Sequence, residues 1–216
     1  SSDLEDLPAE TEEEAGSDAE ENADAASEES VDDVEIDVEA ALQDRILGDP
    51  EAPIKISEHS SFTCSHCANF HSRTYPALME SHINTGKAYL VFSDFPLNAP
   101  ALDASITARC IRDNEQYFKF VDFLFKNQNA WAYSNSYRGF LQDASEQFGL
   151  SEARFEACIN NEELRTGLAE KVEAASKQWH IKSTPSFVIN NKTLVRGALS
   201  HDAFVKQLEA AYGEGT

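Results

Sequence analysis

The sequence predicts an α/β fold, in which a mixed central sheet is flanked by helices and carries an inserted all-helical subdomain. Three observations predict it. A strand, a helix and a second strand occur in that order between Ile54 and Phe95. No strand pattern follows from Ala99 to about Trp179, and two short strands and a helix end the chain. A right-handed βαβ unit and a later β-hairpin can share one sheet, with the helical block inserted between them.

The chain opens with an acidic extension. Residues 1–44 contain 19 of the 39 acidic residues and none of the 17 basic ones, so most of the net charge of −22 lies there. This stretch has no aromatic residue, because Phe62 is the first in the chain. Such a composition buries too little apolar surface to offset chain entropy, and we predict that residues 1–45 are disordered. The extension is then a solvated spacer, or alternatively a repulsive tether or an acidic lure for a basic partner.

Order is expected to begin between Val31 and Ile54. Val34, Ile36 and Val38 alternate with acidic residues, which is typical of a half-buried strand. Residues 40–47 have room for one or two helical turns. Residues 48–53 contain a Gly and two Pro and are predicted to form a loop.

The remaining elements follow from periodicity and from Gly and Pro punctuation. Pro76 is expected to kink or break the helix that starts near Cys64. Asn190-Asn191-Lys192 predicts a tight hairpin. The predicted strands are 54–59, 87–95, 186–189 and 193–195, and the predicted helices are 99–112, 115–127, 137–148, 152–160, 162–179 and about 201–212.

Composition excludes several classes of protein. The chain has 216 residues, and no apolar stretch is long enough to span a bilayer. No basic patch with interleaved aromatic residues occurs, so we do not expect nucleic acid as a ligand.

The first residue is Ser, from which we expect a processed product whose export signal is missing from the sequence. Four cysteines fit a catalytic pair plus a structural pair in an oxidising compartment.

The most informative motif is Cys64-Ser65-His66-Cys67, at the junction between a predicted strand and a predicted helix. The first turn of a helix has unpaired N–H groups that favour an anion, and the thiolate is the reactive form of cysteine. We predict that Cys64 is the nucleophile and that Cys67, one turn further, resolves the mixed disulfide. The alternative is a zinc site that uses these cysteines with His71, and with His59 and His66 nearby. It lacks the second close ligand cluster that structural zinc sites usually have, so no metal is expected.

Two further side chains are candidates for proton and charge chemistry at this dithiol. His66 lies between the cysteines and can stabilise the Cys64 thiolate, or it can be an exposed polar residue. Glu58 shares a strand face with Ile54 and Ile56. It either points into the core beneath the dithiol, where it can accept a proton for Cys67, or faces water at the strand end.

Thr184-Pro185 precedes a predicted strand, where a proline loses no ladder hydrogen bond. Cys110 and Cys158 lie in two different predicted helices of the inserted block. They are either two buried thiols or one disulfide, and an oxidising compartment favours the disulfide.

Together, Glu58, residues 62–71 and residues 183–190 resemble the DsbA family of thioredoxin-fold proteins. The resemblance covers about residues 46–214. It implies a thioredoxin fold in two parts, residues 46–97 and 180–216, with the helical insertion at residues 98–179. The loop at residues 48–53 is similar to that of the alphaproteobacterial branch. The sequence departs from the family at Ser65, which takes the place of proline in the commonest middle pair, Pro-His.

The resemblance implies several roles. Pro185 is expected to be cis and to face the disulfide, and the backbone at Thr184 to pair with an unfolded client. Glu58 matches the buried acid of the family, and a Cys110–Cys158 disulfide resembles the alphaproteobacterial members. The expected activity is the introduction of disulfide bonds into exported proteins by the redox-active Cys64–Cys67 disulfide, with no other cofactor. The implied partners are reduced exported proteins and a re-oxidising membrane protein of the DsbB type, in the bacterial periplasm.

Two other functions stay open at the level of the sequence. One is a disulfide isomerase or reductase, which some relatives become by oligomerising through an N-terminal segment such as residues 34–47. The other is a metal carrier that uses Cys64, Cys67 and a histidine.

Overall fold

The computed structural model describes residues 34–213, so most of the extension predicted to be disordered, residues 1–45, lies outside the described part of the chain. Its last residues are ordered, because Val38–Leu42 form a short helix. One mixed sheet has the strand order β1-β3-β2-β4-β5. β2 and β3 run parallel, and the other neighbouring strands are antiparallel. The strands are β1 (Arg45–Leu47), β2 (Ile54–Ser60), β3 (Ala88–Asp94), β4 (Ser186–Ile189) and β5 (Thr193–Arg196).

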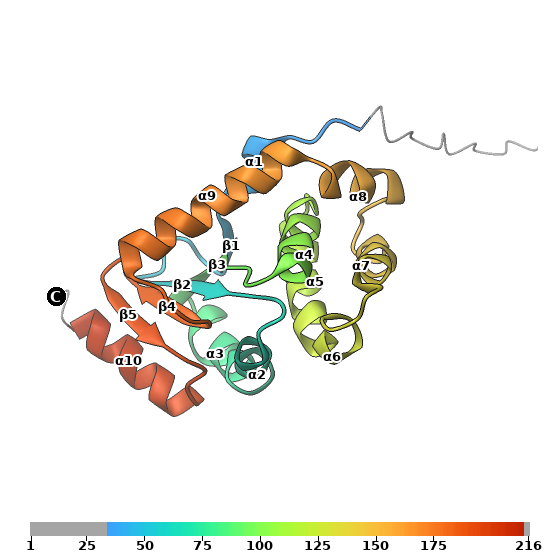
Figure 1. The fold of residues 1–216 in the computed structure, drawn as a ribbon. Helices are drawn as coiled ribbons and strands as arrows, with labels where there is room; N and C mark the ends of the chain where they lie inside the picture. Colours follow the sequence, from blue (N-terminus) through green and yellow to red (C-terminus); the bar gives the residue numbers. More distant parts are fainter. Residues whose placement is uncertain (1–33, 214–216) are drawn as a thin grey trace, which may run out of the picture.

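Helices cover the sheet and form the insertion (Figure 1). None of the helices within the described residues combines the length and apolar character that a membrane span needs. The helices are α1 (Val38–Leu42), α2 (Ser65–Arg73), α3 (Tyr75–Leu78), the π-helical η2 (Met79–Ile83), α4 (Ala99–Arg109), α5 (Asn114–Lys126), α6 (Gln128–Trp131), α7 (Tyr137–Glu146), α8 (Glu152–Ile159), α9 (Glu162–Trp179) and α10 (His201–Gly213).

Figure 1 shows α9 on one side of the sheet and α2, α3 and α10 on the other, with α4 to α8 grouped beside the sheet. The fold is therefore the predicted mixed α/β sheet with a helical insertion between β3 and β4. The core on the α2 side includes three rings, Phe70, Phe187 and Phe204, whose centroids lie 4.7 to 5.6 Å apart.

The central strand β2 is buried on both faces, because helices cover both sides of the sheet. Its alternation therefore carries less information than in a half-exposed strand, and polar residues also point inward. Glu58 is one of these: it is fully buried opposite Phe92 of β3 and Phe187 of β4.

The predicted strand at Val34–Val38 is wrong. The apolar residues there are half-buried and the acidic ones exposed, as the alternation indicates, but no strand pairs with the segment. Its carboxyl end turns instead into α1, because the Asp37 carboxylate accepts a hydrogen bond from the N–H of Ala40 at 2.9 Å. α1 packs against α9, and the strand β1 that follows pairs with β3. β1 has only three residues, which are too few to show the alternation that identifies a strand in a sequence.

The dithiol helix breaks where Pro76 predicts. α2 ends at Arg73, and the chain resumes in the short helix α3 with Pro76 in its first turn, followed by η2. The hairpin between β4 and β5 also forms as predicted. Asn190 and Asn191 adopt positive φ angles of 50° and 54°, which asparagine tolerates better than most residues.

Candidate active site

The end of β2 delivers Cys64 to the first turn of α2. Cys64 is the N-cap residue, with an extended backbone (φ −82°, ψ 118°), and Cys67 is fully buried one turn later. The Cys64 sulfur accepts a hydrogen bond from the N–H of Cys67 at 3.2 Å. A side chain that caps a helix in this way satisfies one of the unpaired N–H groups of the first turn. The two thiols are unbonded to any other cysteine.

Several donors at the helix end favour the ionised form of Cys64. Its pKa falls to about 6, chiefly through a hydrogen bond with the Cys67 side chain, and partial burial opposes this shift. The Thr184 side chain and the N–H groups of Cys67 and His66 lower the pKa further. Burial raises the pKa of Cys67, and its hydrogen bond to Cys64 raises it further. One sulfur is therefore a thiolate near neutral pH while its neighbour keeps its proton.

The loop before β4 lies against the same sulfur. The Thr184–Pro185 peptide bond is cis, and both residues are buried. The Cys64 thiol donates to the carbonyl oxygen of Thr184 at 3.5 Å. The structure thus brings Thr184 and Pro185, 120 residues away in the chain, to the side of the dithiol.

The His66 imidazole is exposed, and the backbone N–H of His66 is one of several groups that lower the pKa of Cys64. Helix geometry points the N–H of an early residue at the sulfur, and stabilisation of the thiolate by the His66 imidazole stays a prediction.

Glu58 lies in the core and forms a pair with His71, one turn after Cys67 on α2. His71 Nε2 and Glu58 Oε1 are 2.9 Å apart, and the two side chains are 3% and 0% exposed. The imidazole stacks on Phe125 and Tyr75, with ring centroids 4.2 and 4.6 Å away. The second carboxylate oxygen, Oε2, has no hydrogen-bond partner among the described residues.

His71, one of the three histidines considered for a zinc site, is thus hydrogen-bonded to Glu58. Within residues 34–213, no group of three or more His, Cys, Asp or Glu side chains is arranged to hold a metal ion.

The helical insertion holds the loop that carries Cys64, a role that the sequence did not reveal. The buried amide of Gln128, on α6, donates to the carbonyl oxygens of Phe62 and Cys64 at 2.8 and 3.0 Å. The Tyr133 hydroxyl donates to the Thr63 carbonyl oxygen at 3.3 Å. No local pattern marks these residues, because their partners lie 64 to 70 residues earlier.

Cys110 and Cys158 form a disulfide, with an S–S distance of 2.05 Å, that joins the end of α4 to α8. It lies within the helical insertion and is not one of the groups gathered around Cys64.

Comparisons with known proteins agree with this geometry. A thioredoxin family model matches residues 40–210. A Rickettsia typhi protein provisionally named a protein-disulfide oxidoreductase is 33% identical over 147 residues, 68% of this chain and 54% of that protein. The chain thus spans about half the length of the curated relatives it matches.

Solved structures share the fold. Wolbachia pipientis alpha-DsbA1 superposes with a TM-score of 0.73 and 31% identity, over 80% of this chain and 92% of that one. Bacillus subtilis BdbD, in its oxidised form, matches with a TM-score of 0.71 and 17% identity, over 79% and 93% of the two chains. At that lower identity the likeness concerns the fold alone.

Proposed function

Because the chain belongs to the DsbA family of thioredoxin-fold protein-disulfide oxidoreductases, we propose that it introduces disulfide bonds into exported proteins by dithiol–disulfide exchange. The observation that carries this proposal is the Cys64 sulfur, capped by the N–H of Cys67 and held at a pKa of about 6 beside a buried partner thiol. A stabilised thiolate makes the reduced protein more stable, so that its disulfide is a stronger oxidant.

The exchange takes place in two steps that move two electrons in total. A client thiolate attacks Cys64 Sγ of the Cys64–Cys67 disulfide, which forms a mixed disulfide and releases Cys67 as a thiolate that takes up a proton. A second client thiolate then attacks the client sulfur of the mixed disulfide and releases the Cys64 thiolate. The client dithiol has then lost two electrons and two protons and become a disulfide, and the Cys64–Cys67 pair has been reduced.

The difference between the two thiols supports this order of events. Cys64 is partly exposed and can meet a client, whereas Cys67 is fully buried. The raised pKa of Cys67 means that it leaves as a thiolate only transiently and is soon protonated. We assign Glu58, with its unpaired Oε2 and its partner His71, as the buried acid–base pair that exchanges this proton with Cys67.

Client recognition is assigned to the backbone at Thr184, next to Pro185. An extended client chain can add to this segment as a short strand, which holds its cysteine near Cys64 Sγ. The contact between the Cys64 thiol and the Thr184 carbonyl oxygen supports this assignment.

The implied partners are reduced exported proteins and a membrane protein of the DsbB type, which accepts the two electrons and restores the disulfide. The implied compartment is the bacterial periplasm, where thiols are kept oxidised. A role as an isomerase that oligomerises through residues 34–47 receives less support. Part of that segment, α1 and the residues after it, packs against α9 of the same chain, and Lys171 Nζ donates to the Leu42 carbonyl oxygen at 2.6 Å.

The reduction potential of the Cys64–Cys67 couple tests the proposal. We expect equilibration with glutathione to give a value well above that of a cytosolic thioredoxin, which is about −270 mV. The oxidised protein should also convert a reduced dicysteine protein to its disulfide form, and the Cys64→Ser variant should not. As a matched control, Ser65→Ala leaves both thiols in place and should retain the activity. A potential near that of thioredoxin, or client oxidation by Cys64→Ser, would overturn the proposal.

A further inference from the structure

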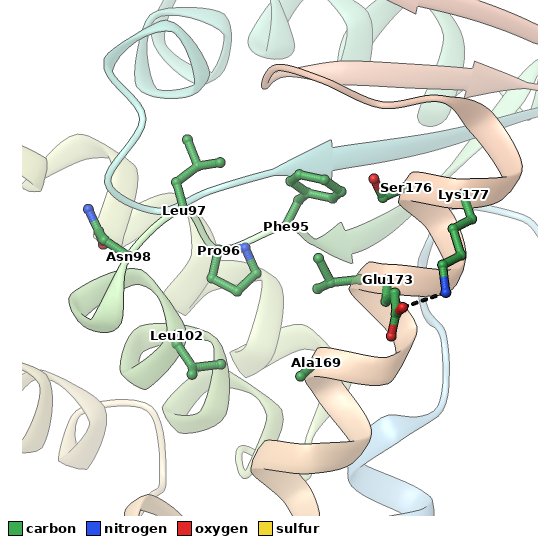
Figure 2. A pocket seen from close by; sticks show the side chains of 10 residues that line it. Phe95, Pro96, Leu97, Asn98, Leu102, Ala169, Glu173, Ser176 and Lys177 are labelled. Atoms are coloured by element: carbon green, nitrogen blue, oxygen red, sulfur yellow. Dashed lines mark hydrogen bonds and ion pairs between the residues drawn. The ribbon is translucent and has the colours of Figure 1, made fainter.

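An open apolar groove lies between α4 and α9, beside the loop that follows β3. Figure 2 shows its lining, with Phe95, Pro96 and Leu97 on one wall and residues of α9 on the other. Its volume is about 560 Å³, and Leu102 of α4 and Val172 of α9 also line it. Leu97 is 57% exposed, so its apolar side chain is accessible to a ligand from solvent. We name this feature the α4–α9 groove.

Both walls of the α4–α9 groove are connected to residues around Cys64, one through hydrogen bonds and the other through the course of the chain. On one wall, the N–H of Leu97 donates to Ser61 Oγ at 3.3 Å. The Asn98 side chain accepts a hydrogen bond from the Thr63 hydroxyl at 3.1 Å. Thr63 is the residue before Cys64, so this end of the groove lies within about 10 Å of the Cys64 backbone. The other wall, α9, ends at Trp179, and the chain then runs through Ile181 to Thr184.

The charged side chains and several polar atoms around the groove have partners within the chain. Glu173 and Lys177 form an ion pair at its rim, and the Ser176 hydroxyl donates to the Ile181 carbonyl oxygen. The Asn98 amide oxygen accepts hydrogen bonds from Thr63 and from the N–H of Ala101. The groove therefore presents apolar surface rather than a free charge, and its chemistry fits an apolar side chain better than an anion or a polar metabolite.

We propose that the α4–α9 groove is a side-chain subsite for client polypeptides, which selects clients with a large apolar residue a few positions from the reacting cysteine. This inference rests on the proposed function, because it assumes a client chain held at Thr184 with its sulfur at Cys64. An extended chain advances about 3.3 Å per residue, so a residue about three positions from the client cysteine reaches the groove. Reduced, unfolded chains present such residues, because cysteines and large apolar residues are both usually buried in a folded protein and become exposed together when it is unfolded.

The test uses two reduced peptides that each carry two cysteines and differ at one position, Phe or Ser, three residues from the first cysteine. A parallel pair carries the substitution on the other side of the cysteine. The oxidised full chain is mixed with each peptide, and the second-order rate of peptide oxidation is measured after acid quenching. We expect the Phe peptide of one pair to react about tenfold faster than its Ser counterpart, equivalent to about 1.4 kcal/mol.

Two variants alter the groove without touching the thiols. Leu97→Ser removes an exposed apolar wall, and Val172→Glu places a carboxylate in the groove. Both should reduce the Phe-to-Ser ratio to less than twofold, with the rate for the Ser peptide and for dithiothreitol unchanged. The matched control is Ala174→Glu, which adds the same charge at an exposed position of α9 outside the groove lining and should keep the tenfold ratio.

The outcomes separate this inference from the proposed function. If the wild-type chain oxidises no peptide, the proposed function fails. If it oxidises all peptides at equal rates, or if Leu97→Ser and Val172→Glu keep the full preference, the subsite is overturned and the proposed function stands. A change in sedimentation of the groove variants with an unchanged preference would assign the groove to contacts between copies of the chain, and would likewise overturn the subsite.

Discussion

At the scale of single residues, the reactivity of Cys64 depends on a few donors aimed at its sulfur. Thr184 is the most distant of them in sequence, and its buried hydroxyl makes no hydrogen bond within the described residues. It nevertheless lowers the pKa of Cys64, because it can donate to the thiolate. One hydroxyl on a loop 120 residues away thus helps to lower the pKa of Cys64.

Thr184→Val tests this contribution, since valine has nearly the same shape and no hydroxyl. We expect the pKa of Cys64 to rise by roughly 0.7 units, the equivalent of a hydrogen bond of about 1 kcal/mol. The measurement is the thiolate absorbance at 240 nm as a function of pH. Thr184→Ser, which keeps the hydroxyl, should titrate like the wild type, and an unchanged pKa in the valine variant would contradict the assignment.

His59 is a second residue whose protonation matters. It is buried on β2, neither ring nitrogen has a hydrogen-bond partner among the described residues, and burial lowers its pKa to about 4. The unfolded chain binds a proton at this residue near pH 6.5, whereas the folded chain does not. The contribution of His59 to the free energy of unfolding is therefore fully present above pH 6.5, and it is lost as the pH falls toward 4.

We expect His59→Leu to weaken that acid sensitivity. In the wild type, protonation of His59 in the unfolded chain lowers the free energy of unfolding by on the order of 3 kcal/mol between pH 7 and pH 4. Urea unfolding at several pH values measures it. His180→Asn, at an exposed histidine with a positive φ of 52°, is the matched control and should keep the wild-type dependence. Identical pH profiles for the wild type and His59→Leu would exclude this source.

At the scale of elements, a buried arginine ties three segments together. Arg109, at the end of α4, pairs with Asp94 of β3 at 2.7 Å, and both side chains are 1% exposed. Its guanidinium also donates to the carbonyl oxygens of Gln43 and Phe92 at 2.6 and 3.3 Å. The chain between α1 and β1 is thereby attached to both the sheet and the insertion.

Arg109→Leu should destabilise the protein by about 3 to 5 kcal/mol, because it leaves the Asp94 carboxylate buried without its partner. The double variant Asp94→Leu/Arg109→Leu removes both charges and should lose less stability than the single variant. Chemical denaturation measures both free energies of unfolding. A double variant less stable than Arg109→Leu would show that the ion pair itself, rather than the unpaired charge, dominates.

At the scale of the whole molecule, the long regular elements were predictable and the connections between distant segments were not. The strand 186–189 and the helix 162–179 have the predicted bounds, because periodicity and flanking turn residues define them locally. β1 and α6 have three and four residues and were missed. Gln128 and the Glu58–His71 pair were not predicted either, since their partners come from other elements.

The disulfide gives a prediction at the same scale. Cys110 and Cys158 are separated by 48 positions in the sequence, and cross-linking a loop of that length stabilises the folded state by about 4 kcal/mol in the chain-entropy account. Cys110→Ala/Cys158→Ala should lower the free energy of unfolding by up to this amount. The pKa of Cys64 should stay unchanged, because neither cysteine contacts it. Intact mass after alkylation of the oxidised wild type should show no free thiol. Labelling at Cys110 and Cys158 would contradict the bond.

The most direct test of the central claim is the rate of alkylation of Cys64 in the reduced full chain, measured by iodoacetamide labelling and peptide mass spectrometry from pH 4 to 10. Only the thiolate reacts, so the rate rises with pH around the pKa of the sulfur. We predict a midpoint near pH 6, with Cys67 unlabelled throughout that range. A midpoint near pH 8.5, the value of an ordinary thiol, would contradict the account.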